Sequence, residues 1–419
     1  MKKRIQFLFI LILLSIDVAA QNYVVTSIDF KGSKKTNISF LSNLIHTKSG
    51  NTLNINTLKE DIIRLIRLPA IANATYTIEK KTKTCTVKIK LDENQTLIPV
   101  ANLFKTSNEE IAYSIGLFEH NFLQKSISVG AWYQKNIYDS YGANLKAPYL
   151  FTPKIGLALN FTNLATQEPV FFPNGTALYK YNNISSEVLG LYQYNFRNKI
   201  STGINIFKET YTTTEIIVPG APESYSLNKI LFKLIYTYEN LKYNYQYISG
   251  FKSELNIQYV TSTEDESDDF AIAWNDFLYY KRLNKKGNWA TRLRVGLSKN
   301  DETPFAPFAV DNNLNLRGVG NIIDRGTGVI IVNTEYRHTI KENNWYAIQS
   351  NIFIDAGTWR NPGGDFGNFT DTNNVRLFSG AGLRFIHKRI FNLVLRADFG
   401  FGITKDEPNG LVFGVGQYF

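Results

Sequence analysis

Between residue 96 and the end of the chain, many segments alternate apolar and polar residues, as in TRLRVGLS (291–298) and FNLVLRADFGF (391–401). A period of two is that of a β-strand with two unlike faces. The apolar positions are often large and aromatic, and the polar positions repeatedly carry full charges. This combination is typical of a barrel that meets lipid outside and water in its lumen, and closure removes the unpaired edges that hydrocarbon does not tolerate.

The first twenty residues have a different character. Three basic residues, Lys2 to Arg4, precede an apolar run from Ile5 to Ile16, and the small residues Ala19 and Ala20 follow. This pattern predicts a secretory signal peptide over residues 1–20, and the apolar run is too short to span a membrane. Because no long apolar segment follows, the sequence argues against a helical membrane protein.

Charge and cysteine content exclude further classes. The net charge is +10, and loss of three basic and one acidic residue with the signal peptide leaves +8. The mature chain has no lysine tract or basic helix, and its arginines are spread along alternating strands, so we exclude nucleic acid as a partner. Cys85 is the single cysteine, so no intramolecular disulfide can form, and we expect it to be a small buried residue.

Residues 21–95 predict a small α+β domain rather than part of the barrel. Strand and helix patterns follow one another in the order strand, helix, helix, strand, strand, with Asn56 as the expected cap of the second helix. The expected elements are 23–32, 37–45, 53–68, 71–80 and 85–94. The block resembles a POTRA module, and this resemblance implies a periplasmic domain that binds polypeptides.

Residues 96–419 are expected to form the barrel. Plausible strands near 410–419, 390–403, 375–387, 345–359, 328–341, 288–300 and 270–283, continued back to a first strand near 96–105, give about sixteen antiparallel strands. Long connections alternate with short turns, as expected for the outer and periplasmic ends of such a barrel. We predict that the longest connection, 301–327, folds into the lumen.

The chain ends in GLVFGVGQYF, in which Leu411, Phe413, Val415 and Phe419 are expected to share one face. This ending resembles the C-terminal sorting signal of outer-membrane barrels, with Phe413, Gly414 and Phe419 as its candidate residues.

One carboxylate stands among apolar residues in IFIDAGTW (352–359). If Ile352 and Ile354 face lipid, Asp355 points into the lumen. The preceding long connection offers a cationic partner, Arg317, and Gly318 after it permits a tight turn at a loop tip. We therefore predict an Arg317–Asp355 pair, which can be planar and bidentate. Glycines of the wall, Gly357, Gly380 and Gly382, are expected to let the tip approach.

The order LRGVG, NTEYR, IFIDAGTW, SGAGLRF and a terminal Phe resembles the BamA superfamily, which includes TamA, two-partner-secretion transporters and bacterial surface antigens. The resemblance implies that an arginine-glycine motif at the tip of the sixth outer loop meets a Phe-x-Asp-x-Gly motif on the barrel wall. The chain departs from the family pattern at Gln124, where glycine is usual, and at Val319, where an aromatic is usual. The matching residues are Arg317 and Gly318 on the loop and Phe353, Asp355, Gly357, Gly380, Gly382 and Arg384 on the wall.

The resemblance implies an outer-membrane insertase or translocase, accessory or dedicated to particular clients because only one POTRA-like module is present. Its partners would be unfolded outer-membrane or secreted polypeptides, membrane lipid, and periplasmic chaperones or accessory subunits. The alternative is a passive diffusion channel whose luminal arginines favour anions. Such arginines are expected at Arg292, Arg294, Arg384 and Arg396.

Chemical catalysis is not expected. The four histidines lie far apart in sequence without metal-ligand spacing, no cofactor-binding motif is present, and we find no serine–histidine motif of a barrel phospholipase. We therefore predict a protein without metal, cofactor or enzymatic activity.

Overall fold

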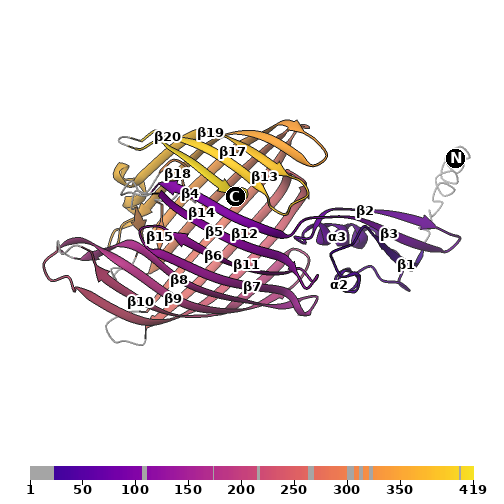
Figure 1. Ribbon diagram of the computed structural model, residues 1–419, viewed down its shortest axis with the longest axis horizontal. Helices are drawn as coiled ribbons and strands as arrows, with labels where there is room; N and C mark the ends of the chain where they lie inside the picture. The colour runs from indigo at the N-terminus through magenta and orange to yellow at the C-terminus, as the bar shows by residue number, and fades with distance from the viewer. Residues whose placement is uncertain are drawn as a thin grey trace, which may run out of the picture.

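The computed structural model describes residues 23–105, 111–172, 174–214, 218–262, 269–299, 306–310, 315–319, 324–404 and 407–419. The predicted signal peptide, residues 1–20, lies outside these ranges. A small α+β domain sits at one end of a long antiparallel barrel (Figure 1). No helix in the described part of the chain is long and apolar enough to cross a membrane.

The N-terminal domain has the predicted order of elements. It contains β1 (Val24–Lys31), α2 (Ile38–Leu44), α3 (Ile55–Ile66), β2 (Ile71–Lys80) and β3 (Thr84–Glu93). The sheet order is β1-β3-β2, so β1 and β2 are its edges. Apolar residues of both helices pack on one face of this sheet, because α3 repeats buried residues at helical spacing.

In this domain the predicted helix cap, Asn56, is wrong, and the predicted burial of Cys85 is confirmed. Helix α3 is capped by Asn54 rather than Asn56, because the Asn54 side chain accepts hydrogen bonds from the backbone N–H groups of Asn56 and Thr57. Cys85 is 1% exposed in the domain core, and burial raises the pKa of its thiol.

The barrel is one antiparallel sheet of sixteen strands in the described part of the chain. Neighbouring strands pair in simple up-and-down order, except that the short strands β15 (Phe308–Ala309) and β16 (Arg325–Gly326) form a separate ladder in the connection between β14 and β17. The wall strands are β4 (Leu97–Lys105), β5 (Ile111–Phe122), β6 (Ile127–Lys135), β7 (Asp139–Thr152), β8 (Ile155–Phe172), β9 (Gly175–Gln193), β10 (Asn198–Thr213), β11 (Ser224–Asn244), β12 (Tyr247–Ser262), β13 (Phe270–Leu283), β14 (Gly287–Lys299), β17 (Gly328–Glu342), β18 (Tyr346–Arg360), β19 (Val375–His387), β20 (Val394–Gly402) and β21 (Gly410–Val415).

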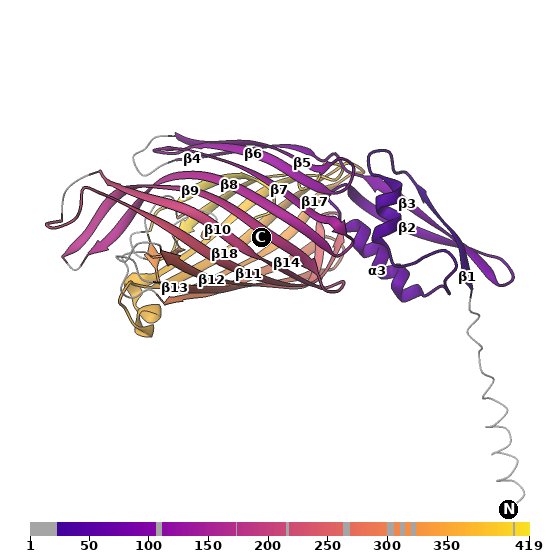
Figure 2. The ribbon, with the colours of Figure 1, turned by 90° about the horizontal axis from the view of Figure 1, so that it is seen from below.

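Alternation along the strands separates an apolar outer surface from a luminal surface, as predicted. Ile352 and Ile354 are 63% and 51% exposed on the outside, whereas Asp355, which follows Ile354, is fully buried. The connection between β18 and β19, with the short 3-10 helices η1 (Phe366–Thr370) and η2 (Thr372–Asn374), lies at the end opposite the N-terminal domain (Figure 2).

The two edge strands of the barrel sheet, β4 and β21, lie next to each other at a seam. The described residues of these two strands form no ladder pairing with each other, so the sheet is nearly but not fully closed.

The end of the chain differs from the prediction. β21 stops at Val415, and the backbone turns at Gly416, whose φ is +97°. Phe413 is 52% exposed on the outside, whereas the Phe419 ring packs beside Arg337 in the lumen. The prediction that Phe413 and Phe419 share one face is therefore wrong, because the turn at Gly416 reverses the alternation.

Candidate functional site

The described parts of the connection between β14 and β17 lie inside the barrel. Val310, Leu316 and Val319 are completely buried. They pack against apolar side chains that point into the lumen from the wall, which we call the luminal apolar patch; it includes Val329, Ile331, Trp359 and Phe378. Alternation alone predicted a polar lumen. The patch is tolerated because the loop covers it and removes its surface from water.

Arg317, at the tip of this loop, binds Asp355 on β18 with two parallel hydrogen bonds. Arg317 Nε donates to Oδ2 at 2.8 Å, and Nη2 donates to Oδ1 at 2.9 Å. The backbone N–H of Arg317 also donates to Oδ2 at 3.0 Å. Both side chains are fully buried, so this charge-assisted geometry satisfies a carboxylate that could not otherwise be held inside the barrel.

Two aromatic rings pack near the Arg317 guanidinium. Its Cζ lies 3.6 Å from the ring centroid of Phe353 and 4.2 Å from that of Tyr418. Planar guanidinium groups stack well on aromatic faces. Phe353 was predicted from the wall motif, whereas Tyr418 comes from the segment after β21 and was not predicted.

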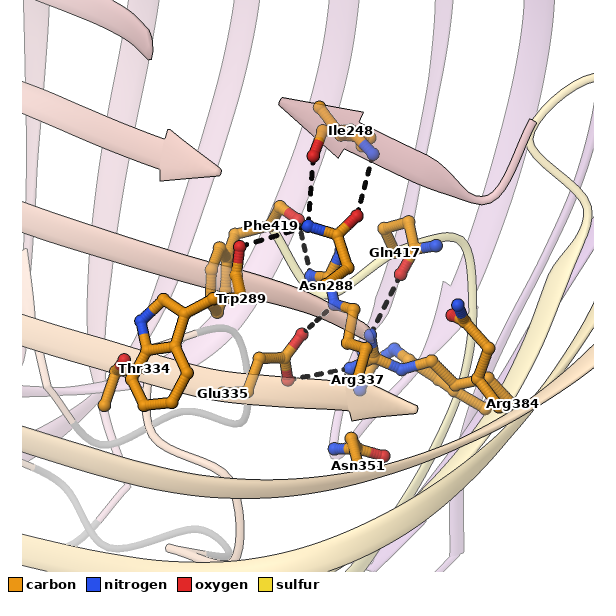
Figure 3. A network of polar contacts seen from close by, with 12 residues as sticks. Ile248, Asn288, Trp289, Thr334, Glu335, Arg337, Asn351, Arg384, Gln417 and Phe419 are labelled. Carbon is orange, nitrogen blue, oxygen red and sulfur yellow. Dashed lines mark hydrogen bonds and ion pairs between the residues drawn. The ribbon is translucent and has the colours of Figure 1, made fainter. Parts of the chain in front are cut away.

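Glu335 on β17 is the centre of the surrounding charges. Its carboxylate accepts hydrogen bonds from Arg317 Nη1 at 2.6 Å, from Arg337 Nε at 2.5 Å and from Arg384 Nη2 at 2.8 Å. Glu335, Arg337 and Arg384 lie together in Figure 3. All of these side chains are completely buried. A single carboxylate thus holds three arginines from a loop and two strands.

A third carboxylate, Asp398 on β20, completes the group. Arg396 Nη1 donates to Asp398 Oδ2 at 3.1 Å, and Asn351 Nδ2 donates to Oδ1 at 2.9 Å. Arg317 Nη1 is 3.8 Å from Asp398 Oδ1. We call the whole set the luminal arginine cluster; it consists of Arg317, Arg337, Arg384 and Arg396 with Glu335, Asp355 and Asp398.

Glycines determine how closely the loop tip approaches the wall. Gly318 has φ +95°, and a Cβ added there would lie 2.8 Å from Gly400 Cα, so both the turn and the contact require glycine. A Cβ at Gly357 would lie 2.8 Å from Val310 of the loop, in agreement with its predicted role.

Gly380 and Gly382 differ from the prediction. A Cβ at Gly380 would lie 2.5 Å from the ring of Phe353, and one at Gly382 would lie 2.2 Å from Asp398 Oδ1. These glycines therefore make room for the wall side chains that hold Arg317, and it is Gly400 that meets the tip itself.

The N-terminal domain meets the near mouth of the barrel through Arg67, the residue after α3. Arg67 Nε lies 3.1 Å from Glu239 Oε1 of β11. Its guanidinium Cζ is 4.4 Å from the Phe196 ring centroid, and Nη1 donates to the Phe196 carbonyl at 2.9 Å. On the other side of the domain, the backbone N–H of Asn37 donates to the carbonyl of Gln124 at 3.0 Å. These contacts hold α3 across the mouth (Figure 2).

Replacing Arg67 by alanine is expected to loosen the domain from the barrel, because the ion pair and the stacking contact are lost together. Cleavage of the 94–97 connection by a dilute protease should become about tenfold faster, as expected if opening becomes about 1.4 kcal/mol easier. Lys59→Ala, on the exposed face of the same helix, is the control. Equal cleavage rates for both variants would show that Arg67 does not fasten the domain.

Sequence reasoning missed Glu335, Asp398 and Tyr418 as parts of the site. A signal for Glu335 was present, since Glu335 and Arg337 in NTEYR are two positions apart and therefore share one strand face. For Tyr418 the alternation of the last strand was such a signal, because Tyr418 falls on the face opposite to Leu411, Phe413 and Val415. Among the described residues, no group of three or more histidine, cysteine, aspartate or glutamate side chains is placed to hold a metal ion.

Comparisons with known proteins agree with this architecture. The POTRA family model, described as surface antigen variable number repeat, matches residues 23–94. BamA from Haemophilus ducreyi lacking POTRA domains 1–3 superposes with a TM-score of 0.57 at 17% identity, over 94% of this chain and 84% of that one.

Two further structures have the same fold. CdiB from Acinetobacter baumannii superposes with a TM-score of 0.61 at 14% identity, over 94% of this chain and 73% of that one. CdiB from Escherichia coli superposes with a TM-score of 0.58 at 11% identity, over 96% of this chain and 91% of that one. No curated protein sequence matches this chain.

Proposed function

We propose that this chain, which has the POTRA-and-barrel fold of the BamA superfamily, is an accessory or client-dedicated insertase or translocase for unfolded polypeptides. In this proposal the barrel lies in an outer membrane and the POTRA domain in the periplasm, as the matching fold and the POTRA family model support. The observation that carries the proposal is the seam between β4 and β21, whose described residues form no ladder with each other, on a barrel whose luminal loop is anchored by Arg317. Such a seam offers backbone hydrogen-bonding groups to an incoming strand.

The POTRA domain supplies the receiving surface in this proposal. Its sheet ends at β1 and β2, and either edge can accept an extended polypeptide by strand addition. The client would then pass to the seam, where lipid is the destination for a barrel strand. Periplasmic chaperones or accessory subunits would deliver the client. No step requires bond-making chemistry, so no catalytic residue is assigned.

The runner-up function, an anion-favouring diffusion channel, is less well supported by the lumen. Arg294 pairs with Asp276 at 2.7 Å, Arg384 with Glu335 and Arg396 with Asp398. Arg292 Nη2 donates to Asn315 Oδ1 at 3.1 Å, so this arginine holds the loop. Arginines that are neutralised or engaged in this way contribute little field to a permeating anion.

Depletion of the protein, followed by quantitative proteomics of the outer membrane and cell surface, tests the proposal. We expect loss of one or a few outer-membrane or exported proteins. Loss of many barrels would instead indicate a general assembly factor. An unchanged proteome together with altered solute uptake would reject polypeptide handling and favour the channel.

A further inference from the structure

A cavity lies in the crease between the N-terminal domain and the near-end turns of the barrel. Its volume is about 420 Å³, which is in the range of small-ligand pockets. Glu60 and Arg64 of α3 line one side of it. Lys154, in the turn between β7 and β8, and residues 194–197, in the turn between β9 and β10, line the other. We call this cavity the crease pocket; it is separate from the luminal arginine cluster.

Local contacts hold the walls of the crease pocket in place. The Phe196 ring packs against the domain, with its centroid 5.5 Å from Arg64 Cζ. In the same turn, the Asn195 side chain accepts hydrogen bonds from the backbone N–H groups of Arg197 and Asn198, at 2.9 and 3.0 Å. The pocket is therefore preformed where the domain docks on the barrel.

The cations that line the crease pocket are not neutralised within it. The side chains of Lys154 and Arg197 are exposed and form no ion pair with any residue in the described part of the chain. Arg64 uses Nη1 for Asp61 and His46, at 2.8 and 3.3 Å, which leaves Nε and Nη2 as further donors. Three cationic side chains from three segments suit a phosphate group.

Glu60 adds one carboxylate to this set. It lies on the same side of α3 as Arg64, because the two residues are four positions apart. Its side chain is exposed, and no ion pair joins it to another residue among those the structure describes. A ligand that matches both signs of charge carries a phosphate and a cationic group on a short linker. The headgroup of phosphatidylethanolamine has this chemistry.

The barrel surface beside the crease pocket is suited to lipid. Ile155, Tyr192 and Tyr194 are exposed at the near ends of β8 and β9. The rings of Tyr192 and Tyr194 lie 6.4 Å apart in an edge-to-face arrangement. Exposed aromatic residues at the end of a membrane barrel mark the level of the lipid headgroups. A phosphate in the crease pocket would therefore lie at headgroup level, which favours a lipid over a free anion.

We propose that the crease pocket binds the headgroup of phosphatidylethanolamine from the leaflet nearest the N-terminal domain. Lys154, Arg197 and Arg64 bind the phosphate, Glu60 binds the ammonium, and the acyl chains lie along the apolar wall of the barrel. The bound lipid bridges α3 and two barrel turns, so it holds the domain across the mouth. This inference goes beyond the proposed function, since it requires a barrel in a membrane but not the handling of polypeptides.

Native mass spectrometry of the whole protein, titrated with lipid in detergent, tests the site. Phosphatidylethanolamine should bind more tightly than phosphatidylglycerol, which lacks an ammonium, and phosphatidylcholine, whose methylated ammonium donates no hydrogen bond. In Lys154→Gln with Arg197→Gln the affinity should fall about tenfold or more, because each cation near a headgroup contributes to binding. Glu60→Gln should bind the three lipids about equally, since it loses the ammonium contact.

Protease cleavage of the 94–97 connection tests the bridge between the two parts. In nanodiscs that contain phosphatidylethanolamine, cleavage should be several-fold slower than in nanodiscs of phosphatidylcholine alone, because the bound lipid opposes opening of the domain. Lys154→Gln with Arg197→Gln should remove this difference. Equal cleavage of the unmodified protein in both kinds of nanodisc would overturn the bridge.

The controls distinguish a specific site from general attraction of lipid to a basic protein. Lys242→Gln with Lys285→Gln removes the same charge from exposed positions that do not line the crease pocket, and should bind lipid as the unmodified protein does. Equal losses in the two double variants, or displacement of the lipid by excess inorganic phosphate, would overturn the site. Depletion proteomics is independent of this outcome, so failure of the lipid site leaves the polypeptide-handling proposal standing.

Discussion

Arg317→Ala is expected to remain in the outer membrane but to lose function and much of its barrel stability. The substitution leaves Asp355 completely buried without its cation and removes one of three donors to Glu335. Breaking a buried ion pair by removing one partner costs about 3–5 kcal/mol. The measurement is the temperature at which the folded band converts to the unfolded band on a detergent gel, together with complementation of a depleted strain.

The matched control is Arg294→Ala. Arg294 also forms a bidentate pair, with Asp276, but its side chain is 28% exposed and its partner 13% exposed. Partly hydrated pairs contribute roughly 0–1 kcal/mol, so this variant should unfold near the temperature of the unmodified protein. Equal unfolding temperatures for Arg317→Ala and Arg294→Ala would show that the loop-tip pair does not stabilise the barrel.

A paired substitution separates stability from function at this site. In Arg317→Met with Asp355→Leu both charges disappear, and replacing a buried pair by apolar residues is often neutral for stability. We expect this variant to unfold at a higher temperature than Arg317→Ala. It should still fail in complementation, because the hydrogen bonds between Arg317 and Asp355 that position the loop tip are lost. Full complementation would show that the pair acts only as a structural contact.

The second large effect is expected for Glu335→Gln. The Glu335 carboxylate accepts hydrogen bonds from Arg317, Arg337 and Arg384. A neutral amide in its place would leave the positive charge of these buried arginines without its central anion. We expect a loss of about 3 kcal/mol or more, measured as the shift of the unfolding temperature in detergent. Adding Arg337→Met removes one of the surplus cations and should recover part of that loss.

Glu342→Gln is the control on the same strand. Glu342 pairs with Lys388 at the periplasmic end of β17, and its side chain is 42% exposed. The Lys388 side chain is 6% exposed, but its Nζ also donates to the Asn343 carbonyl at 2.9 Å, so loss of the exposed carboxylate should cost roughly 0–1 kcal/mol and barely change the unfolding temperature. A similar loss in Glu342→Gln and Glu335→Gln would mean that position in the buried cluster has no special importance.

The candidate site was only partly predictable from sequence. Arg317 and Asp355 were paired before the fold was known, because an isolated acid on a luminal strand face requires a cation and the family resemblance indicated where to find it. The resemblance also led to Phe353, whose ring the structure places on the guanidinium. Gly380 and Gly382 were assigned to the wrong neighbour, since a strand pattern shows which face a residue occupies but not which side chain fills the space beside it.

The sequence by itself determined the barrel, its two faces and the α+β domain before it, because alternation with a period of two and the helical spacing in α3 are local properties. Only the tertiary structure decided which other side chains join the Arg317–Asp355 pair in the lumen. Arg317 and Glu335 are 18 residues apart, and Arg337 and Phe419 are 82 apart. Their contacts depend on the loop entering the barrel and on the turn at Gly416, and no local pattern records either event.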